Sequence, residues 1–475
     1  MSPSDLQEVE VRAVALDRLA GLLGRERAER FTRSAVAARS SLAGRRVINV
    51  NSTATGGGVA ELLQTLLAYA RGAGVDARWV VVEGDAAFFE ITKRIHNHLY
   101  GTPGDGGPLG PEEHRCYEDT IERNMTRLHA VARAGDIVVL HDPQTAGLTR
   151  HLVAAGVRVV WRCHVGIDTQ NEHSERAWTF LRPYLDGLDA YVFSRLQFAP
   201  PWVPSDRLAV IPPSIDPFSA KNEVIDSTRV IRLLEYVGLL PANGSDPEIS
   251  FQRRDGSRGQ VARRVDMLGT GSLPPRPVPI VLQASRWDAV KDMRGVMIGF
   301  AESVAPRTDA HLVLAGPEAG GVADDPEAAD VLRDCLQTWS GLPGAIRSRV
   351  HLVNMPMDDC DEAAAIVNAL QRYSSVVVQK SLAEGFGLTV TEAMWKERPV
   401  VGSAVGGIVD QIIDGETGAL VDARDLDQYA RAVCAMLGDP QLAMRMGAAG
   451  RERVRDEYLG DRHLLQWARL FERLA

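Results

Sequence analysis

The sequence predicts an α/β protein made of two domains, each with a mostly parallel β-sheet covered by helices on both faces. The chain of 475 residues is longer than one hydrophobic core usually organises. Apolar runs typical of buried strands alternate with helical patterns in both halves, and this alternation indicates parallel sheets. A proline-rich stretch over residues 198–217 separates the two series and is the best candidate for a linker.

The first half begins with expected helices, because residues 5 to about 43 are charged, rich in Ala and Leu, and helical in period. The first strand is expected at 46–51, and a glycine-rich loop leads from it into an apolar helix at 62–73. Further strands are predicted at 77–82, 136–141, 157–164 and 189–194. We therefore assign residues 1–205 to a first domain.

The second half repeats the alternation, and we assign residues 206–459 to a second domain. Strands are predicted at 278–285, 310–316, 349–354, 375–379 and 399–402. Residues 241–279 are rich in Gly, Ser, Arg and Pro without an apolar pattern, so we expect part of them to form a flexible surface insertion. The tail is helical, and its last helix, about 460–475, is expected to pack back on the first domain. Ligands of such folds bind at the carboxyl ends of strands, which predicts a site in a cleft between the two domains.

The composition excludes several classes of function. A formal net charge of −9 argues against a general nucleic-acid binder, whose surface must be basic. The five cysteines are odd in number and form no Cys-x-x-Cys pair, which indicates reduced thiols in a cytoplasmic protein and no zinc site. No signal peptide is evident at the N-terminus, and no apolar run is long enough for a membrane span.

The stretch Glu384-Gly-Phe-Gly-Leu-Thr-Val-Thr-Glu392 places two carboxylates eight positions apart around a glycine-flanked turn. A predicted strand precedes it and a predicted helix over 388–396 follows. The glycines thus open a helix at the carboxyl edge of a strand, where free backbone N–H groups suit a phosphate or a sugar hydroxyl. Glu384 can bind a ligand from the loop, and Glu392 can reach another part of it. The alternative is an ordinary strand-loop-helix joint with two solvated glutamates, and the rest of the chain argues against it.

Two cations follow the first strand of the second half, in Ser285-Arg-Trp-Asp-Ala-Val-Lys-Asp292. Arg286 offers a planar fork and Lys291 a point charge, and both suit a diphosphate. A reaction that releases a diphosphate builds negative charge on it. Fixed cations at that point stabilise the charge without a metal ion.

The first half supplies polar groups at the ends of three predicted strands. Gly57 and Gly58, after the first strand, let the backbone approach a ligand closely, although the Gly-x-Gly-x-x-Gly pattern of dinucleotide binding is absent. His164, in Trp161-Arg-Cys-His164, is expected to hydrogen-bond the transferred sugar or to steady charge near its anomeric carbon. The hydroxyls of an acceptor sugar are expected to contact His141, Asp142 and Gln144.

Taken together, these segments resemble the retaining glycosyltransferases of family four, in the branch of the trehalose synthases, and the trehalose phosphorylases are similar. The resemblance spans roughly residues 45 to 435. The combinations most specific to the branch are Phe-Phe-x-x-Thr-Lys from Phe88, Trp161-Arg-Cys-His164 and Gln379-Lys-Ser381. The resemblance implies the GT-B fold, two Rossmann-like domains with parallel sheets facing a central cleft. The segment 241–279 departs from the family pattern.

The resemblance also implies a reaction and roles for residues. A nucleoside diphosphate glucose and free glucose would give α,α-trehalose with retention, and the catalytic residues would be His164, Arg286, Lys291 and Glu384. Glu384 would face the donor sugar, Glu392 would hold the ribose, and the backbone near Asn354 would contact the base. The implied donor-binding residues are Gly57, Gly58, Arg286, Lys291, Asn354, Met355, Glu384, Gly385, Phe386, Gly387, Leu388, Thr389 and Glu392.

The expected partners are small molecules, with ADP-, UDP- or GDP-glucose as the donor substrate and no required cofactor. Mg²⁺ is expected at most to stimulate the reaction, and no protein motif is expected to bind it. No nucleic acid or membrane is expected as a partner, and a homodimer is common among similar enzymes. Three alternatives stay open: a trehalose phosphorylase using glucose 1-phosphate, a sugar-nucleotide 2-epimerase, and a non-catalytic sugar-nucleotide sensor.

Overall fold

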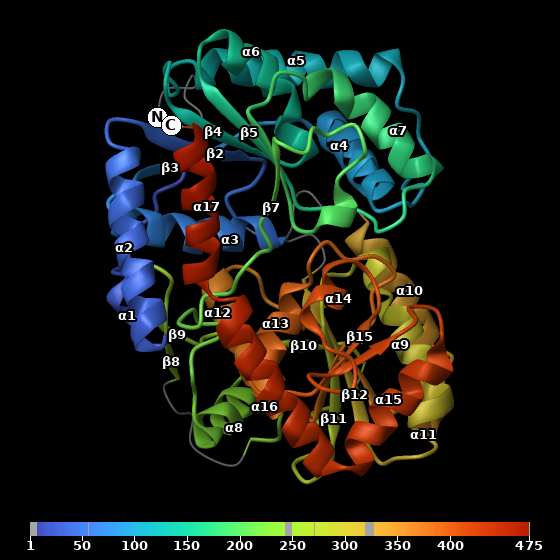
Figure 1. The fold of residues 1–475 in the computed structure, drawn as a ribbon. Coiled ribbons are helices and arrows are strands. Elements are labelled where there is room, and N and C mark those ends of the chain that lie inside the picture. Colours follow the sequence, from blue (N-terminus) through green and yellow to red (C-terminus); the bar gives the residue numbers. More distant parts are fainter. Residues whose placement is uncertain (1–6, 56, 243–248, 270, 319–326, 475) are drawn as a thin grey trace. The chain divides into compact units, whose positions relative to one another are not determined.

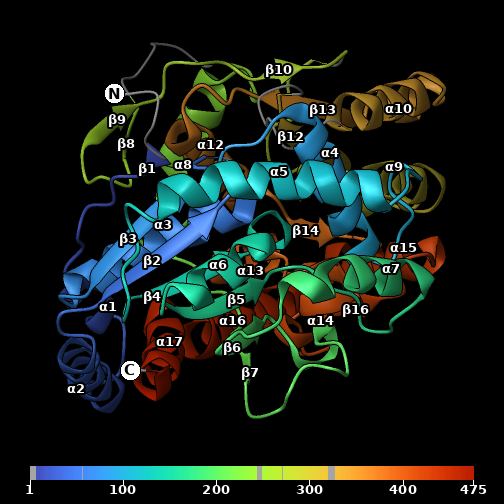
Figure 2. The same ribbon diagram turned by 90° about the horizontal axis from the view of Figure 1, so that it is seen from above.

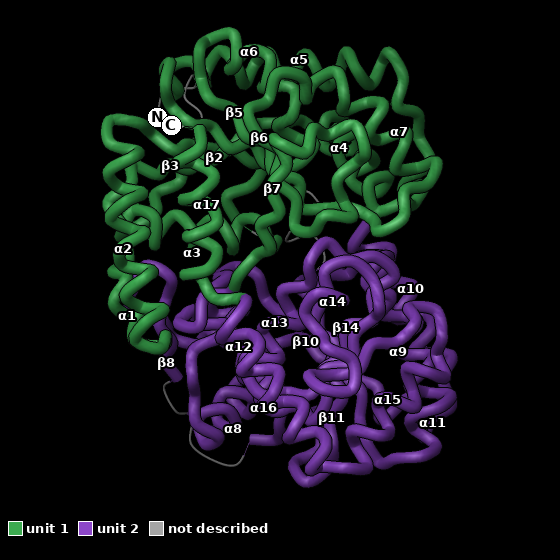
Figure 3. The backbone as a smooth tube through the Cα atoms, viewed as in Figure 1, with its two compact units in different colours: residues 1–214, 458–475 green, residues 215–457 purple. Residues whose placement is uncertain are grey.

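The computed structural model describes residues 7–55, 57–242, 249–269, 271–318 and 327–474. The chain forms two compact units, and Figure 3 colours them separately. Unit 1 comprises residues 1–214 and 458–475, and unit 2 comprises residues 215–457. The division between 214 and 215 lies inside the second proline-rich segment of the linker stretch.

Unit 1 is built on a seven-stranded sheet with the order β1-β3-β2-β4-β5-β6-β7. All neighbouring strands are parallel except β1, which is antiparallel to β3. Figure 2 shows strands β3, β2, β4, β5 and β6 side by side. The strands are β1 (Gln7–Glu8), β2 (Arg46–Asn51), β3 (Asp76–Val81), β4 (Ile137–His141), β5 (Arg158–Cys163), β6 (Ala190–Phe193) and β7 (Leu208–Val210). The five strands predicted for the first half are confirmed to within one residue at each end.

Helices cover both faces of this sheet (Figure 1). They are α1 (Asp17–Ala20), α2 (Arg25–Ser41), α3 (Gly57–Gly72), α4 (Ala86–Leu99), α5 (Pro111–Leu128), α6 (Thr149–Ala154), α7 (Glu172–Leu181) and α17 (Gly460–Leu474), with the short 3₁₀ helices η1 (Pro143–Leu148), η2 (Arg182–Tyr184) and η3 (Leu196–Phe198). Local sequence begins several of them: the Asp85 carboxylate accepts from the Phe88 N–H at the start of α4, and Pro111 opens α5.

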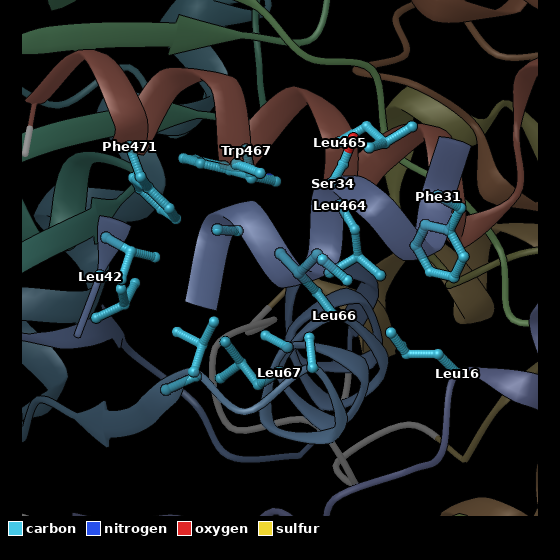
Figure 4. A pocket seen from close by; sticks show the side chains of 18 of the residues that line it. Leu16, Phe31, Ser34, Leu42, Leu66, Leu67, Leu464, Leu465, Trp467 and Phe471 are labelled. Atoms are coloured by element: carbon cyan, nitrogen blue, oxygen red, sulfur yellow. The ribbon is translucent and has the colours of Figure 1, made fainter. Parts of the chain in front are cut away.

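The last helix, α17, belongs to unit 1 and packs against α2 and α3. Its apolar face, with Trp467, Leu470 and Phe471, joins a buried cluster that includes Leu42 and Leu66. Near its start, the buried Asp461 forms a bidentate ion pair with the partly buried Arg27, with N–O distances of 2.6 and 2.7 Å. An apolar pocket lies between these three helices and β2, and Figure 4 shows the side chains that line it.

Unit 2 repeats the architecture around a seven-stranded sheet with the order β10-β13-β12-β11-β14-β15-β16. Only the β10–β13 pairing is antiparallel. The strands of this sheet are β10 (Asp266–Met267), β11 (Ile280–Ala284), β12 (His311–Pro317), β13 (Val350–Met355), β14 (Val376–Gln379), β15 (Val400–Ser403) and β16 (Ala419–Val421). The five strands predicted for the second half are confirmed to within two residues.

The helices of unit 2 bury the apolar runs between these strands. They are α8 (Ser227–Tyr236), η4 (Ala289–Lys291), α9 (Met293–Gly299), the π-helical η5 (Phe300–Val304), α10 (Ala328–Ser340), α11 (Gly344–Arg347), α12 (Cys360–Tyr373), α13 (Leu388–Trp395), α14 (Gly406–Gln411), α15 (Leu426–Gly438) and α16 (Pro440–Glu457). Two buried clusters fill the two sides of the sheet, one around Leu282 and Ile366 and one around Val281 and Phe300. Alternate residues of β11 thus face opposite sides, as a parallel strand buried on both faces requires.

The segment for which the sequence predicted an insertion contains short strands. β8 (Ser250–Gln252) and β9 (Arg258–Gln260) form an antiparallel hairpin, and β10 adds to the edge of the main sheet. Apolar side chains of the segment, including Phe251, Val261 and Leu273, join a buried cluster of unit 2. They are too far apart in sequence to form a periodic pattern, and the pairing of short strands brings them together. Residues 243–248 and 270 lie outside the described residues.

Candidate functional site

The glutamate loop joins β14 to α13, and glycines determine its path. Gly387 is the N-cap of α13 with φ of 86°, in the left-handed region. The turn at the start of α14 packs directly beneath the loop, because a Cβ on Gly406 would lie 1.7 Å from the Glu384 carbonyl oxygen and one on Gly407 would lie 2.5 Å from the Phe386 Cα. The helix therefore begins where the sequence predicts, and the glycine pair of α14 supports the loop.

Glu384 is buried and contacts Lys291. The Lys291 Nζ lies 2.6 Å from the Glu384 Oε2, and the Ser381 hydroxyl lies 3.2 Å from the same oxygen. The Leu382 N–H donates to the Val290 carbonyl at 2.7 Å, so the two loops that carry the pair are also joined through their backbones. Parallel pairing of β11 with β14 places these loops at the same edge of the sheet. The structure thus brings together two of the predicted residues that lie 93 positions apart.

Arg286 follows β11 in the same loop as Lys291, and its side chain is about one-third exposed at 32%. Its Nη2 lies 3.3 Å from the Asp288 carboxylate, which also accepts from the Val290 N–H and so begins η4. Trp287, between them in the sequence, is fully buried. Its ring lies 2.5 Å from where a Cβ on Gly316 would be, so Gly316 leaves the space that this ring needs.

Glu392 is also buried, within α13. Its Oε1 lies 3.6 Å from the Lys221 Nζ. One turn later, the buried Lys396 ammonium donates to the Glu392 carbonyl at 3.1 Å, to Asn222 at 3.0 Å and to Gln371 at 2.7 Å. The sequence pattern missed Lys221 and Lys396, because neither stands in a recognisable motif. Lys396 could have been noticed, since it is a charged residue on the mostly apolar helix predicted over 388–396.

Asn354 and Met355 end β13, which β12 and β11 separate from β14. The Met355 carbonyl accepts from the Glu318 N–H at 2.9 Å, so that oxygen has a backbone partner. The Asn354 amide oxygen is buried and has no protein partner. A buried unpaired acceptor at the carboxyl end of a strand is a candidate for a ligand contact.

In unit 1, the glycine loop lies between β2 and α3. Gly57 begins α3 with φ of 76°, and a Cβ there would meet nothing within 4 Å. Gly58 follows on the first turn of the helix. Gly56, also part of the predicted loop, lies outside the described residues. The start of α3 therefore has open space beside it, as close approach of a ligand requires.

His141 and His164 come together at the carboxyl ends of β4 and β5. The His141 Nδ1 lies 2.9 Å from the His164 Nε2, and the His141 Nε2 lies 3.0 Å from the Asn49 Oδ1. His141 is buried. Both of its ring nitrogens thus have protein partners, and neither is left for a sugar hydroxyl. A sugar hydroxyl would have to replace one of these two contacts, so the acceptor-binding role of His141 stays a prediction. The contact with Asn49 was not predicted, because Asn49 stands inside an apolar strand 92 positions away.

Asp142 has an unusual backbone conformation, with φ of 62° and ψ of −178°. This region is almost confined to glycine, and such strain is found mainly at functional sites. The Asp142 carboxylate accepts from the His164 N–H at 2.7 Å, and its carbonyl accepts from the Trp161 indole at 3.0 Å. Burial raises the pKa of the Asp142 carboxyl to about 7. Gln144 lies on η1, directly after this strained residue, and is partly buried.

Two negative findings apply to the described part of the chain. It contains no cluster of three or more His, Cys, Asp and Glu side chains that could hold a metal ion. No helix within these residues has the length and apolar character that crossing a bilayer requires.

Comparison with known proteins places the chain among sugar transferases. Residues 49–200 match the family model described as trehalose synthase, N-terminal domain, and residues 272–453 match that of glycosyl transferases group 1. A trehalose synthase of Rubrobacter xylanophilus is 35% identical over 436 residues, covering 91% of each chain. A trehalose phosphorylase of Pleurotus pulmonarius is 27% identical and covers 86% of this chain but 54% of its own.

The fold has solved relatives as well. An α,α-trehalose-phosphate synthase (UDP-forming) from Burkholderia vietnamiensis superposes with a TM-score of 0.64 at 14% identity, covering 91% of this chain and 99% of that one. Identity at this level is informative about the fold alone. The predicted GT-B class, with two Rossmann-like α/β units, is confirmed.

Proposed function

Since the chain belongs to the trehalose synthase family of glycosyltransferases, we propose that it makes α,α-trehalose by transferring glucose from a nucleoside diphosphate glucose to free glucose. The observation that carries the proposal is the 2.6 Å contact between Lys291 and Glu384 beside the first residues of α13. A cation and a carboxylate fixed at the carboxyl edge of a parallel sheet suit the phosphate and the sugar of one donor molecule.

Unit 2 supplies the donor contacts in this proposal. Arg286 and Lys291 neutralise the charge that develops on the departing diphosphate, and backbone N–H groups from Gly385 to Leu388 bind the donor. Glu384 accepts from Lys291 and Ser381 through one oxygen. Its other oxygen can then orient a sugar hydroxyl. Glu392 holds the ribose hydroxyls, with Lys221 nearby to compensate its charge.

We propose a retaining reaction on one face of the sugar. The bond between the anomeric carbon and the phosphate oxygen breaks, and the acceptor hydroxyl oxygen forms its new bond on the same face. The departing phosphate takes the acceptor proton. A double displacement would need a carboxylate free to attack the anomeric carbon. The ion pair and hydroxyl contact of Glu384 support an orienting role for it, and a separate nucleophile is not part of the proposal.

Unit 1 supplies sugar-hydroxyl contacts in this proposal, through His164, Asp142 and Gln144. No step needs a metal ion, and Mg²⁺ is proposed only as a stimulator of the diphosphate's departure. A cytoplasmic location and a homodimer are also proposed. The five cysteines without disulfide bonds support the reducing location, and size-exclusion chromatography with light scattering tests the dimer.

Product analysis tests the function directly. The protein is incubated with glucose and, separately, ADP-glucose, UDP-glucose, GDP-glucose or glucose 1-phosphate, and products are identified by carbon-13 NMR. We expect trehalose from at least one nucleotide sugar, and we expect Lys291→Met to form it at least about 100-fold more slowly from the same donor. Trehalose from glucose 1-phosphate alone would identify a phosphorylase. A changed sugar nucleotide without a disaccharide would identify an epimerase, and no product in any tube would contradict the proposal.

A further inference from the structure

A row of hydrogen bonds crosses three neighbouring strands of unit 1. Asn49 lies on β2, His141 ends β4, and His164 follows β5; these strands are adjacent in the sheet in that order. The Asn49 Oδ1 contacts the His141 Nε2 at 3.0 Å, and the His141 Nδ1 contacts the His164 Nε2 at 2.9 Å. The two rings stack with an interplanar angle of 17°. We call Asn49, His141 and His164 the histidine relay.

The direction of the relay follows from the chemistry of its first member. An amide oxygen only accepts, so the His141 Nε2 carries the hydrogen of this contact. A neutral imidazole has one N–H, and the His141 Nδ1 must therefore accept. The His164 Nε2 then donates to it. The remaining ring nitrogen, His164 Nδ1, is left with a lone pair and without a hydrogen.

Both rings are held neutral by their surroundings. Burial and, to a smaller extent, the Arg162 guanidinium together lower the pKa of His141 to about 3. Burial and Arg162 also hold the pKa of His164 well below its ordinary value. Arg162 is buried beside them and donates to the Ser194 hydroxyl at 3.1 Å. A fixed cation next to the rings favours the neutral form over the imidazolium.

We propose that Asn49 and His141 are positioning residues that keep His164 in the tautomer whose Nδ1 accepts a hydrogen bond. On the proposed function, His164 then receives a hydrogen bond from a sugar hydroxyl and does not donate a proton to the leaving group. The ring is also fixed from its backbone, because the His164 N–H donates to the Asp142 carboxylate at 2.7 Å. The relay thus selects a ligand group that carries a hydrogen, such as a hydroxyl, over an ether or a fluorine.

The direct test is NMR on the full chain labelled with nitrogen-15 histidine. His164→Asn identifies the His164 signals by their loss. In the wild-type protein at pH 7 we expect a hydrogen on Nε2 and a lone pair on Nδ1 of His164. A hydrogen on the His164 Nδ1 would overturn the proposal. This measurement does not depend on which sugars react, so it stands apart from the outcome of the product analysis.

Substitutions test the direction of the hydrogen bonds in the histidine relay through their effect on kcat. His141→Gln keeps a donor toward Asn49 and an acceptor toward His164, so we expect kcat within about threefold of wild type. His141→Phe keeps the ring shape but loses both groups, and Asn49→Leu removes the first acceptor. Asn49 also lines the pocket between α2, α3 and α17, whose other lining side chains are apolar except for Ser34, so a leucine meets apolar neighbours on that side. We expect His141→Phe and Asn49→Leu to lower kcat about 10–100-fold, as loss of a group that orients a functional side chain typically does.

Asn124→Leu is the matched control for a lost buried amide. Asn124 lies on α5, is buried, and bonds the backbone of Glu83 and Thr120. We expect it to lower Tm by as much as Asn49→Leu while keeping kcat within about twofold of wild type. Wild-type kcat in both His141→Phe and Asn49→Leu, or equal losses in His141→Gln and His141→Phe, would overturn the proposal.

Discussion

Removal of the Lys291 charge should lower both the stability of unit 2 and the activity, and removal of the Glu384 charge as well should restore only the stability. The Lys291 and Glu384 side chains are only 13% and 7% exposed, and their charged atoms are 2.6 Å apart. Lys291→Met leaves the Glu384 carboxylate buried with one hydroxyl donor, Ser381 at 3.2 Å, and a distant amide, Gln379 at 3.5 Å. Breaking a fully buried pair costs about 3–5 kcal/mol. Because these weaker donors and some solvent remain, we expect about 2–4 kcal/mol.

The double variant Lys291→Met with Glu384→Gln removes both charges and should recover most of this loss. Replacement of a whole buried ion pair by neutral groups is often nearly neutral in stability. For a unit of this size, 1 kcal/mol changes Tm by about 2–4 °C. Calorimetry should therefore show the unit 2 transition about 4–16 °C lower in Lys291→Met and within about 4 °C of wild type in the double variant.

Activity should not recover with stability. If Lys291 stabilises the departing diphosphate, both variants should lose at least about 100-fold in kcat, as loss of one fixed electrostatic contact does. Initial rates of disaccharide formation measure this. A double variant as unstable as Lys291→Met would refute the buried-charge reasoning, and wild-type kcat in Lys291→Met would remove the residue from the mechanism.

Three further outcomes are expected. Gly406→Ala should displace the Glu384 carbonyl oxygen, which would lie 1.7 Å from the new Cβ, and it should lower kcat at least about 100-fold. Gly415 also has a positive φ but lies in open space. As the control, Gly415→Ala should lower the free energy of unfolding by about 1 kcal/mol and keep full activity. The pKa of Asp142 is raised to about 7, so wild-type stability relative to Asp142→Asn should fall as pH rises from about 4 to about 7 and stay level above it; a flat difference in urea titrations would contradict this. Lys396→Met leaves three buried acceptor oxygens without the donor they have in the wild type. It should lower the free energy of unfolding by about 2–4 kcal/mol in guanidinium titrations. An unchanged midpoint of the unfolding transition would show that the three hydrogen bonds add no stability.

The long strands could be predicted because their residues are strongly apolar and β-branched. Residues 376–378 are three valines between polar neighbours, and β14 covers them. The predicted series missed β7 and β16, which have three residues each. Strands this short have no period of their own, and they form because the edge of a sheet already exists beside them.

In the candidate site, too, some features follow from the local sequence and others depend on distant residues. Glycines and carboxylates in one continuous stretch determine the glutamate loop, since the left-handed Gly387 and the helix after it depend on local sequence. The sequence also marked His141 but assigned it a direct sugar contact. Its actual neighbours, Asn49 and His164, lie 92 and 23 positions away, and no local pattern predicts which way a ring nitrogen points.

The sequence by itself determined that the chain alternates strands and helices in two series, that glycine-bounded loops end key strands, and that carboxylates and cations stand on those loops. Only the tertiary structure decided which of these groups meet. Lys291 contacts Glu384 because β11 pairs with β14, and Asn49 reaches His141 because β2 pairs with β4. The order of strands in a parallel sheet is set by crossover connections and by packing of whole helices, and these depend on the chain as a whole.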